Sequence, residues 1–85
     1  MRRAASSVTA NIAEGFGRFH FKDKVRFYQQ ARGSAVELQD HMFLAQDLGY
    51  ISKVKARELF ALDTTITKGI NDLIRSIKNK LNEET

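Results

Sequence analysis

The chain has 85 residues, with 14 Lys and Arg against 10 Asp and Glu, and it contains neither cysteine nor proline. A chain of this length forms one domain, and so small a domain buries only about 60–65% of its unfolded surface, which makes its core thin. The absence of cysteine excludes disulfides and thiolate-bound metals. No run of about 18 apolar residues predicts a membrane span, and the first residues are unlike a signal peptide. We therefore expect a cytoplasmic protein that does not enter a membrane.

The net charge of +4 is unevenly distributed along the chain. Residues 1–33 carry seven basic and two acidic residues (7 − 2 = +5), residues 34–62 carry three and four (−1), and residues 63–85 carry four and four (0). A basic first third is expected to attract phosphate groups or an acidic protein surface. The alternative is a solvated basic face that only keeps the protein soluble.

Residues 2–16 are predicted to form the first helix, because apolar residues recur there every three or four positions. Gly15 and Gly17 provide the permissive backbone that the end of a helix needs. Glu14 precedes Arg18 by four residues, so we expect an ion pair across one turn. The predicted apolar face consists of Ala5, Val8, Ile12, Phe16 and Phe19.

Residues 22–48 are predicted to form a second helix, about 40 Å long. Gly33 lies in its middle, where glycine costs roughly 1 kcal/mol relative to alanine. Together with Ala31, Ser34 and Ala35 it forms a surface of small residues, which favours the close approach of another helix. Gly49 follows as the cap. The predicted apolar face consists of Phe27, Ala31, Ser34, Leu38, Met42, Ala45 and Leu48.

Residues 53–81 are predicted to form a third helix, with Ser52 as its N-cap. The polar tail 82–85 is predicted to be disordered. The predicted apolar face of this helix consists of Leu59, Leu62, Ile66, Ile70, Leu73, Ile77 and Leu81.

Loops of about four residues join these helices, so neighbouring helices are expected to be antiparallel. The first helix is about half as long as the other two and cannot cover the whole apolar face of their hairpin. We therefore expect another chain or a further helix to cover the remainder, and we do not expect a stable monomer.

Several short motifs occur in a fixed order along the chain. They are Arg2-Arg3-Ala4-Ala5, Ala10-Asn11-Ile12-Ala13-Glu14-Gly15, the segment from Gly17 to Asp23, Arg26-Phe27-Tyr28, Ala31-Arg32-Gly33-Ser34, Glu37-Leu38 and Leu48-Gly49-Tyr50. Over residues 2–78 this order resembles the four-helix-bundle family of 23S ribosomal RNA intervening-sequence proteins. That family is related to the accessory proteins of diversity-generating retroelements.

The resemblance implies an all-α, antiparallel up-down bundle, of which this chain supplies three of four helices. In relatives a further helix precedes the Arg2-Arg3 segment, so we expect that the first helix is absent here. Relatives also often have proline at the position of Thr9. The resemblance further implies a homo-oligomer, commonly a pentameric barrel, and a role with nucleic acid. For the retroelement relatives it implies contact with RNA and a reverse transcriptase.

The candidate nucleic-acid-binding residues surround the loop after Gly17. Aromatic side chains can stack on unpaired bases while Arg and Lys neutralise phosphates. The alternative is that both phenylalanines of this loop fill the end of the bundle. The candidate residues are Arg18, Phe19, His20, Phe21, Lys22 and Arg26.

Other candidate positions are predicted to be structural. Asn11 and Glu14 lie on one helix face and are expected to stabilise the turn at Gly15, the alternative being a polar contact in a subunit or ligand site. His20 and His41 lack a second ligand at helical spacing, so we expect no metal and no cofactor. No paired carboxylates or activated nucleophile predict an enzyme. The predicted function is a non-catalytic, self-associating module that binds RNA or a ribonucleoprotein partner, the alternative being a scaffold that contacts an acidic protein.

Overall fold

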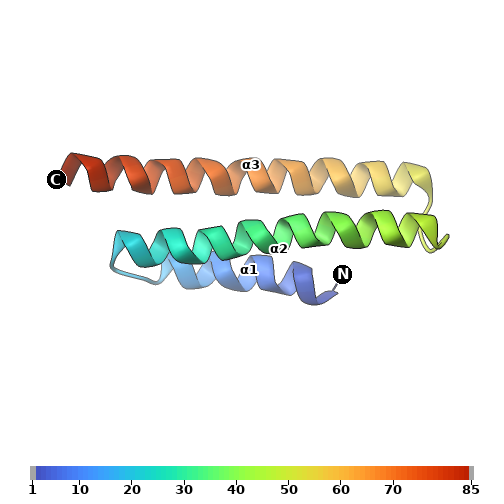
Figure 1. Cartoon of the computed structure of the whole chain (residues 1–85), viewed down its shortest axis with the longest axis horizontal. Coiled ribbons are helices and arrows are strands. Elements are labelled where there is room, and N and C mark those ends of the chain that lie inside the picture. Colours follow the sequence, from blue (N-terminus) through green and yellow to red (C-terminus); the bar gives the residue numbers. More distant parts are fainter. Residues whose placement is uncertain (1, 85) are drawn as a thin grey trace.

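The computed structural model describes residues 2–84, with side chains to residue 82, as three antiparallel helices in an elongated molecule of 51 × 19 × 13 Å (Figure 1). The helices are α1 (Arg2–Phe16), α2 (Phe21–Asp47) and α3 (Lys53–Glu84). Residues 2–84 contain no strand. The prediction of an all-α fold is confirmed.

The helix ends lie close to the predicted positions, with one exception. Helix α1 has its predicted bounds, and α2 begins and ends one residue earlier than expected. Helix α3 continues to Glu84, three residues past the predicted end at position 81. The prediction of a disordered tail is therefore wrong for residues 82–84, and Thr85 lies outside the described residues. The tail contains no proline or glycine, so its backbone can continue the helix.

The turn between α2 and α3 is formed as its sequence predicts. Gly49 has a φ of +79°, a left-handed conformation that glycine adopts without strain. Its neighbour Tyr50 donates its backbone N–H to the Ala45 carbonyl at 2.9 Å, which closes the end of α2. Ser52 then caps α3, since its Oγ accepts the Lys55 backbone N–H at 3.1 Å.

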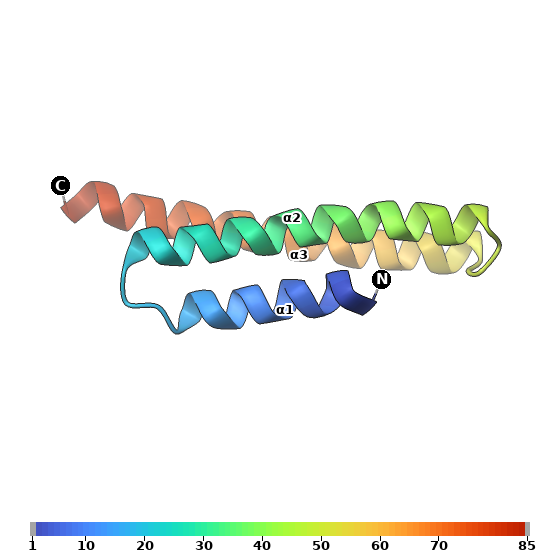
Figure 2. The same ribbon diagram turned by 60° about the horizontal axis from the view of Figure 1, so that its bottom comes forward.

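Helix α2 is the central helix, because the other two both pack against it (Figure 2). Within residues 2–84 no Cα atoms of α1 and α3 lie within 8 Å of each other. These two helices meet only through side chains. The close approach of α1 to α2 is possible because Ala31 and Ala35 on α2 are small and fully buried.

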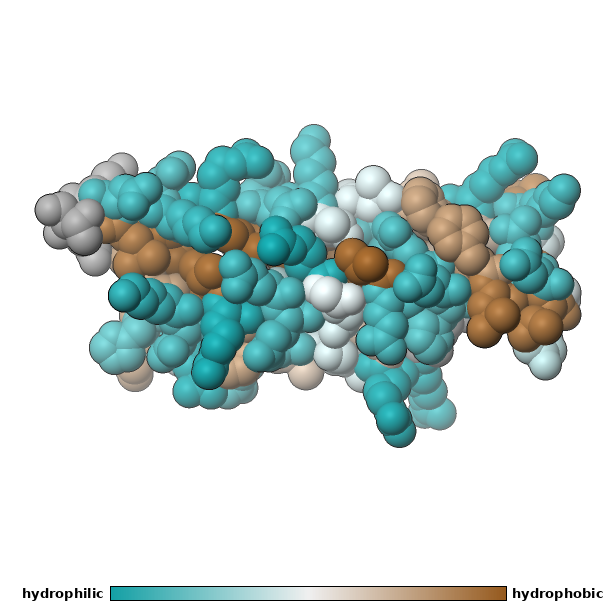
Figure 3. Space-filling view, in the orientation of Figure 1, coloured by the Kyte–Doolittle hydropathy of each residue, from teal (hydrophilic) through white to brown (hydrophobic). Residues whose placement is uncertain are grey.

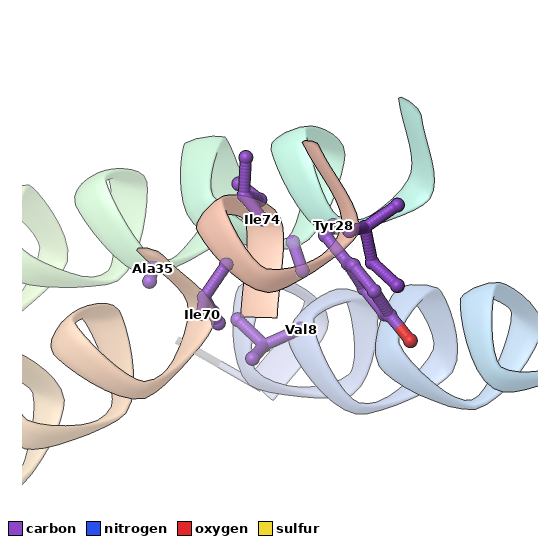
Figure 4. Close-up of a cluster of buried hydrophobic side chains, with 7 residues drawn as sticks. Val8, Tyr28, Ala35, Ile70 and Ile74 are labelled. Atoms are coloured by element: carbon purple, nitrogen blue, oxygen red, sulfur yellow. The ribbon is translucent and has the colours of Figure 1, made fainter. Parts of the chain in front are cut away.

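The core lies where all three helices overlap (Figure 4). Tyr28 of α2 extends toward α1, and its side chain is 1% exposed. Ile12, Phe21, Val25 and Leu73 pack around the core while staying partly exposed. The buried core members are Val8, Tyr28, Ala31, Ala35, Ile70, Ile74 and Ile77.

The buried faces are rotated relative to the predicted ones. On α1, Ala4 is buried instead of Ala5, and Phe16 is 63% exposed. On α2, Tyr28 takes the place expected for Phe27. On α3 most of the buried positions repeat every seven residues and include a carboxylate, whereas two predicted positions, Leu62 and Ile66, are exposed. The buried residues of α3 are Ala56, Asp63, Ile70, Ile74 and Ile77.

The part of the hairpin beyond α1 exposes many large apolar side chains. They belong to the second half of α2, the turn and the first half of α3. Figure 3 shows such side chains at the turn end of the molecule and between α2 and α3. As predicted, α1 does not cover the whole apolar surface of the hairpin. The exposed residues in this part are Phe43, Leu44, Leu48, Tyr50, Val54, Phe60, Leu62 and Ile66, and Val36 is exposed at the level of the start of α1.

Candidate nucleic-acid interface

The loop between α1 and α2 consists of residues 17–20 and is held by backbone contacts and one lysine. The Gly17 N–H is 3.2 Å from both the Ala13 and Glu14 carbonyl oxygens, which ends α1. Lys24 of α2 reaches back and donates its Nζ to the carbonyl oxygens of Gly15 and Phe16, both at 3.1 Å. A positive charge at the C-terminus of a helix is favourable, because the last carbonyl groups carry partial negative charge. Lys24 thus joins α1 to α2 and fixes the start of the loop.

The two phenylalanines of the loop have opposite environments. Phe19 is 95% exposed, so its ring faces solvent. Phe21 is half-buried and packs against the core. The alternative in which both rings fill the end of the bundle therefore holds for Phe21 and fails for Phe19. His20 between them is exposed and occupies the N-cap position of α2 without a side-chain capping bond.

Two arginines stack on one aromatic ring beside this loop. The guanidinium carbons of Arg18 and Arg26 lie 4.7 Å and 5.0 Å from the centroid of the Phe27 ring. Each contact is a cation–π interaction, which stabilises an exposed site by about 0.5–1 kcal/mol. Arg18 also forms the predicted ion pair with Glu14, at 2.8 Å between Nη2 and Oε1. The Phe27 ring therefore holds both guanidinium groups, and Glu14 also holds Arg18, which lines a hollow together with the exposed Phe19.

Two shallow hollows flank the loop, and Phe19, His20 and Asp23 line both of them. The larger, of about 520 Å³, also includes Lys22 and, from the end of α3, Leu81. The smaller, of about 430 Å³, lies on the side of Arg18. Both hollows are open to solvent, a shape that suits a flat ring or a chain segment better than a small enclosed ligand. Five of the six candidate residues line these hollows, with Phe21 also packed against the core, whereas Arg26 lines neither and contacts the Phe27 ring.

Asn11 and Glu14 have separate roles. Asn11 donates its side-chain amide to the Ser7 carbonyl at 2.8 Å and to Ser7 Oγ at 3.1 Å. Ser7 Oγ in turn lies 2.8 Å from Ser34 Oγ on α2. Asn11 therefore supports the contact between α1 and α2, whereas Glu14 pairs with Arg18 on the surface. The expected ion pair of Glu14 is present but exposed, whereas the expectation that Asn11 stabilises a turn at Gly15 is wrong, because Asn11 bonds to Ser7 and Gly15 lies within α1.

Gly15 and Gly33 do not have the roles that the sequence predicted for them. Gly15 lies inside α1, and among the described glycines only Gly49 has a positive φ. A Cβ atom added at Gly15 would lie 2.6 Å from Cε1 of Tyr28, so this position is glycine because the tyrosine ring packs directly on it. By contrast, nothing lies within 4 Å of a Cβ atom added at Gly33. The small surface on α2 accepts α1 at Ala31 and Ser34, and the expected close contact at Gly33 is absent within the described chain.

Asp63 is the buried residue that the sequence patterns missed. Its side chain is 1% exposed, and neither carboxylate oxygen has a hydrogen-bond partner of standard geometry in the described chain. Burial raises the pKa of Asp63 above its ordinary value of 3.8, while the nearby Gln39 side chain lowers it by a smaller amount. The hydroxyl of Thr67, one turn further along α3, is also buried without a partner. The seven-residue spacing from Ala56 through Asp63 to Ile70 is the signal that indicates its burial.

Tyr28 and Lys24 are two further residues that matter and were not singled out. Tyr28 forms an edge-to-face contact with Phe16, at 6.0 Å between ring centroids, and burial raises the pKa of Tyr28.

Residues 2–82, whose side chains are described, contain no cluster of three His, Cys, Asp or Glu residues that could hold a metal ion. None of the described helices is long and apolar enough to span a membrane.

Comparison with known proteins identifies the family. A family model described as 23S rRNA-intervening sequence protein matches residues 1–72. Neither a curated protein nor a solved structure matches the chain. The matched segment contains α1, the loop, α2 and more than half of α3, so it includes the six candidate loop residues and the part of the core up to Ile70. Because the match covers most of the 85 residues, the chain belongs to the 23S rRNA-intervening sequence protein family.

Proposed function

We propose that this protein is a non-catalytic, self-associating module that binds RNA through the loop between α1 and α2. The observation that carries the proposal is the exposure of Phe19, 95%, among basic side chains. The ring of an exposed phenylalanine is in contact with water. A base that stacks on the ring face covers it and contributes about 1–3 kcal/mol to the free energy of binding. Arg18 and Lys22 line the hollows on either side of Phe19, and Arg18 shares the Phe27 ring with Arg26, which supports the proposal.

Unpaired bases fit this surface better than a duplex does. Single-stranded loops offer bases that can stack on an aromatic ring, while their phosphates reach nearby Arg and Lys. Phe19 supplies the ring, and Lys22, Arg18 and Arg26 supply the positive charges. Asp23 and Glu14 also line the hollows and disfavour anions in general. This mixture of charges favours a ligand that combines an aromatic ring with a phosphate group. A ligand that offers only negative charge is disfavoured.

The test measures binding of a labelled RNA hairpin with a single-stranded loop at two salt concentrations. Phe19→Ala should weaken binding by about 5- to 150-fold, the equivalent of one lost stacking contact. The double variant Lys22→Glu/Arg26→Glu should also reduce the dependence of binding on salt, because fewer counterions are released. The matched control is Lys53→Glu/Lys55→Glu, which makes the same change in charge at the other end of the molecule. This control should bind the RNA more tightly than the loop variant does.

Two results would contradict the proposal. Equal losses in the loop variant and the control would indicate that only net charge matters. A lack of binding by the unmodified chain at low salt would favour the alternative function, a self-associating scaffold whose basic surface contacts an acidic protein.

A further inference from the structure

One side of α3 carries a row of basic side chains with an amide between them. Its members follow each other at spacings of three, four and three residues, which places them on one side of the helix. We call Lys68, Asn71, Arg75 and Lys78 the basic row. Asp72 lies beside the row and forms only an exposed ion pair with Arg75, at 3.4 Å. An exposed pair of this kind contributes little, so Arg75 can exchange that carboxylate for another anion.

Arg32 of α2 adds a further positive group to the basic row. Its Nη1 donates a hydrogen bond to Asn71 Oδ1 at 2.8 Å, across the contact between α2 and α3. Arg32 is half-buried and forms no ion pair within residues 2–82. The Asn71 amide carries no charge, so it fixes the direction of the guanidinium without neutralising it. Arg32 is thus held in place with its charge available to an anion.

The surroundings of the basic row contain few acidic residues, and α1 does not cover it. Since Arg32 lies opposite Asn71 in antiparallel helices, residues 68–78 of α3 lie opposite residues 25–35 of α2. Those residues of α2 include two arginines and no Asp or Glu. Ser34, which contacts α1, lies two residues from Arg32 and therefore about 200° around the helix from it. The basic row is an uncovered, positively charged surface, which attracts anions.

The basic row leads to the larger of the two hollows beside the loop. Leu81, three residues after Lys78, lines that hollow together with Phe19 and Lys22. Figure 1 shows the end of α3 at the same end of the molecule as the loop between α1 and α2. From Leu81 back to Lys68 the helix extends by about 20 Å. An extended ligand that begins at Phe19 can therefore continue along the basic row.

We propose that the basic row and Arg32 bind the phosphate groups of the RNA strand that continues from a base stacked on Phe19. The inference rests on the proposed RNA binding and adds the path of the strand to it. The phosphates of one stacked strand follow each other about every 3.4 Å, so the roughly 15 Å between Lys68 and Lys78 corresponds to about four nucleotides. Arginine and lysine bind phosphate oxygens through charge-assisted hydrogen bonds.

The test compares two labelled RNAs at several salt concentrations. One is a hairpin with a single-stranded loop, and the other is the same hairpin with single-stranded extensions of about six nucleotides, long enough to span the basic row. Phe19→Ala should weaken binding of both RNAs. Lys68→Gln/Arg75→Gln/Lys78→Gln should weaken binding of the extended RNA at least about tenfold more than that of the hairpin. It should also reduce the slope of log K against log salt for the extended RNA by about 2, because three phosphate contacts contribute about 0.7 each.

The matched control removes three positive charges away from the basic row. Lys53→Gln/Lys55→Gln/Lys80→Gln changes exposed lysines only. Lys80 lies two residues from Lys78 and therefore about 200° around α3 from it. The control should weaken both RNAs to a similar, smaller extent, because it lowers the net charge without removing a phosphate contact.

A single substitution separates binding from folding. Asn71→Asp keeps the size of the side chain but gives Arg32 a carboxylate, so that the contact between α2 and α3 becomes an ion pair. The melting temperature should not fall. Binding of the extended RNA should nevertheless weaken about tenfold or more, the equivalent of one lost hydrogen bond to a charged group. A merely structural role of the Arg32–Asn71 contact predicts no change in binding.

The failures are distinguishable. Suppose that Phe19→Ala weakens both RNAs, but the row variant loses no more than the control or Asn71→Asp binds as before. The path along α3 is then wrong, and the loop site stands. A loss in the row variant without a loss in Phe19→Ala would overturn the loop contact and the path that begins there. A lack of RNA binding by the unmodified chain at low salt would overturn the path and the proposed function together.

Discussion

The two halves of the α2–α3 hairpin differ in what covers them. In the half next to the loop, α1 packs on α2, and the side chains of Tyr28, Ile70 and Ile74 are almost fully buried. In the half next to the turn, the rings of Phe43 and Phe60 lie 5.6 Å apart and remain partly exposed. Both halves have helical apolar patterns. The hairpin by itself buries only small or central residues such as Met42, Ala45 and Ala56, so the difference shows that large rings become fully buried where a third helix packs on it.

The same comparison separates two interaction surfaces. The covered half ends in the basic loop, where Phe19 is exposed among Arg and Lys side chains. The turn half ends in exposed apolar side chains, among them Phe43, Leu44 and Leu48. The basic loop and this apolar surface therefore lie at opposite ends of the molecule.

The largest effect is expected from removing the aromatic ring at the centre of the covered half. Tyr28→Ala should lower the free energy of unfolding by about 3–5 kcal/mol, because it leaves a cavity where α1 packs on α2. Phe43→Ala is the matched change in the turn half. Since Phe43 is 55% exposed, we expect a clearly smaller loss. Urea unfolding at low protein concentration measures both, and equal losses would mean that the two halves do not differ in packing.

The contact between α1 and α2 is tested by a pair of glycine substitutions. Gly15→Ala should lower the free energy of unfolding by about 1–3 kcal/mol, because the added methyl group collides with the Tyr28 ring. Gly33→Ala should raise it by up to about 1 kcal/mol, because alanine favours the helix and nothing lies within 4 Å. Thermal unfolding of both variants measures the difference. A stabilising Gly15→Ala would show that the ring moves aside freely.

The buried carboxyl of Asp63 predicts a dependence on pH. Its pKa is raised in the folded chain, so between 3.8 and the folded value the folded chain binds more protons than the unfolded chain. Its contribution to the free energy of unfolding therefore falls as pH rises through that range. At pH 7, Asp63→Asn should raise the free energy of unfolding, because the neutral amide does not carry the desolvation cost of a buried carboxylate charge.

The control for this effect is the exposed Asp40 on α2. The gap in stability between Asp63→Asn and the unmodified chain should shrink as the pH falls toward 4, whereas Asp40→Asn keeps Asp63 and so keeps the pH dependence of the unmodified chain. A gap for Asp63→Asn that is constant with pH would show that Asp63 is not a titrating buried acid.

The smallest effect is expected at the end of α1. Lys24→Met should lower the free energy of unfolding by about 0.3–1 kcal/mol, because the carbonyl oxygens of Gly15 and Phe16 lose a positive partner. Lys22→Met changes an exposed lysine two residues earlier and serves as the control. The chemical unfolding curves of the two variants should differ at low salt. They should differ less at high salt, since salt screens the interaction of Lys24 with the carbonyl groups. Identical curves at low salt would contradict a capping role for Lys24.

Local signals in the sequence predicted the helices well. The three-and-four periodicity indicated all three, and Gly49 and Ser52 correctly marked the turn between α2 and α3. The pair of Glu14 and Arg18 was predicted from its spacing and is present. These features depend on residues within a turn or two of each other, so the order of the amino acids is sufficient to determine them. The three-residue extension of α3 is the exception.

The tertiary structure alone decided which face of each helix is buried and which loop ring is exposed. An apolar stripe is wide enough that Tyr28 or Phe27, and Ala4 or Ala5, can equally lie at its centre. The choice is made by the packing of α1 on α2, which needs the small side chains of the two helices to meet. The tertiary structure also turns Phe21 to the core and leaves Phe19 in solvent, and the packing of α3 on α2 buries Asp63 beside Gln39. Such outcomes depend on residues far apart in the chain, because burial is a property of surfaces that only the assembled helices bring together.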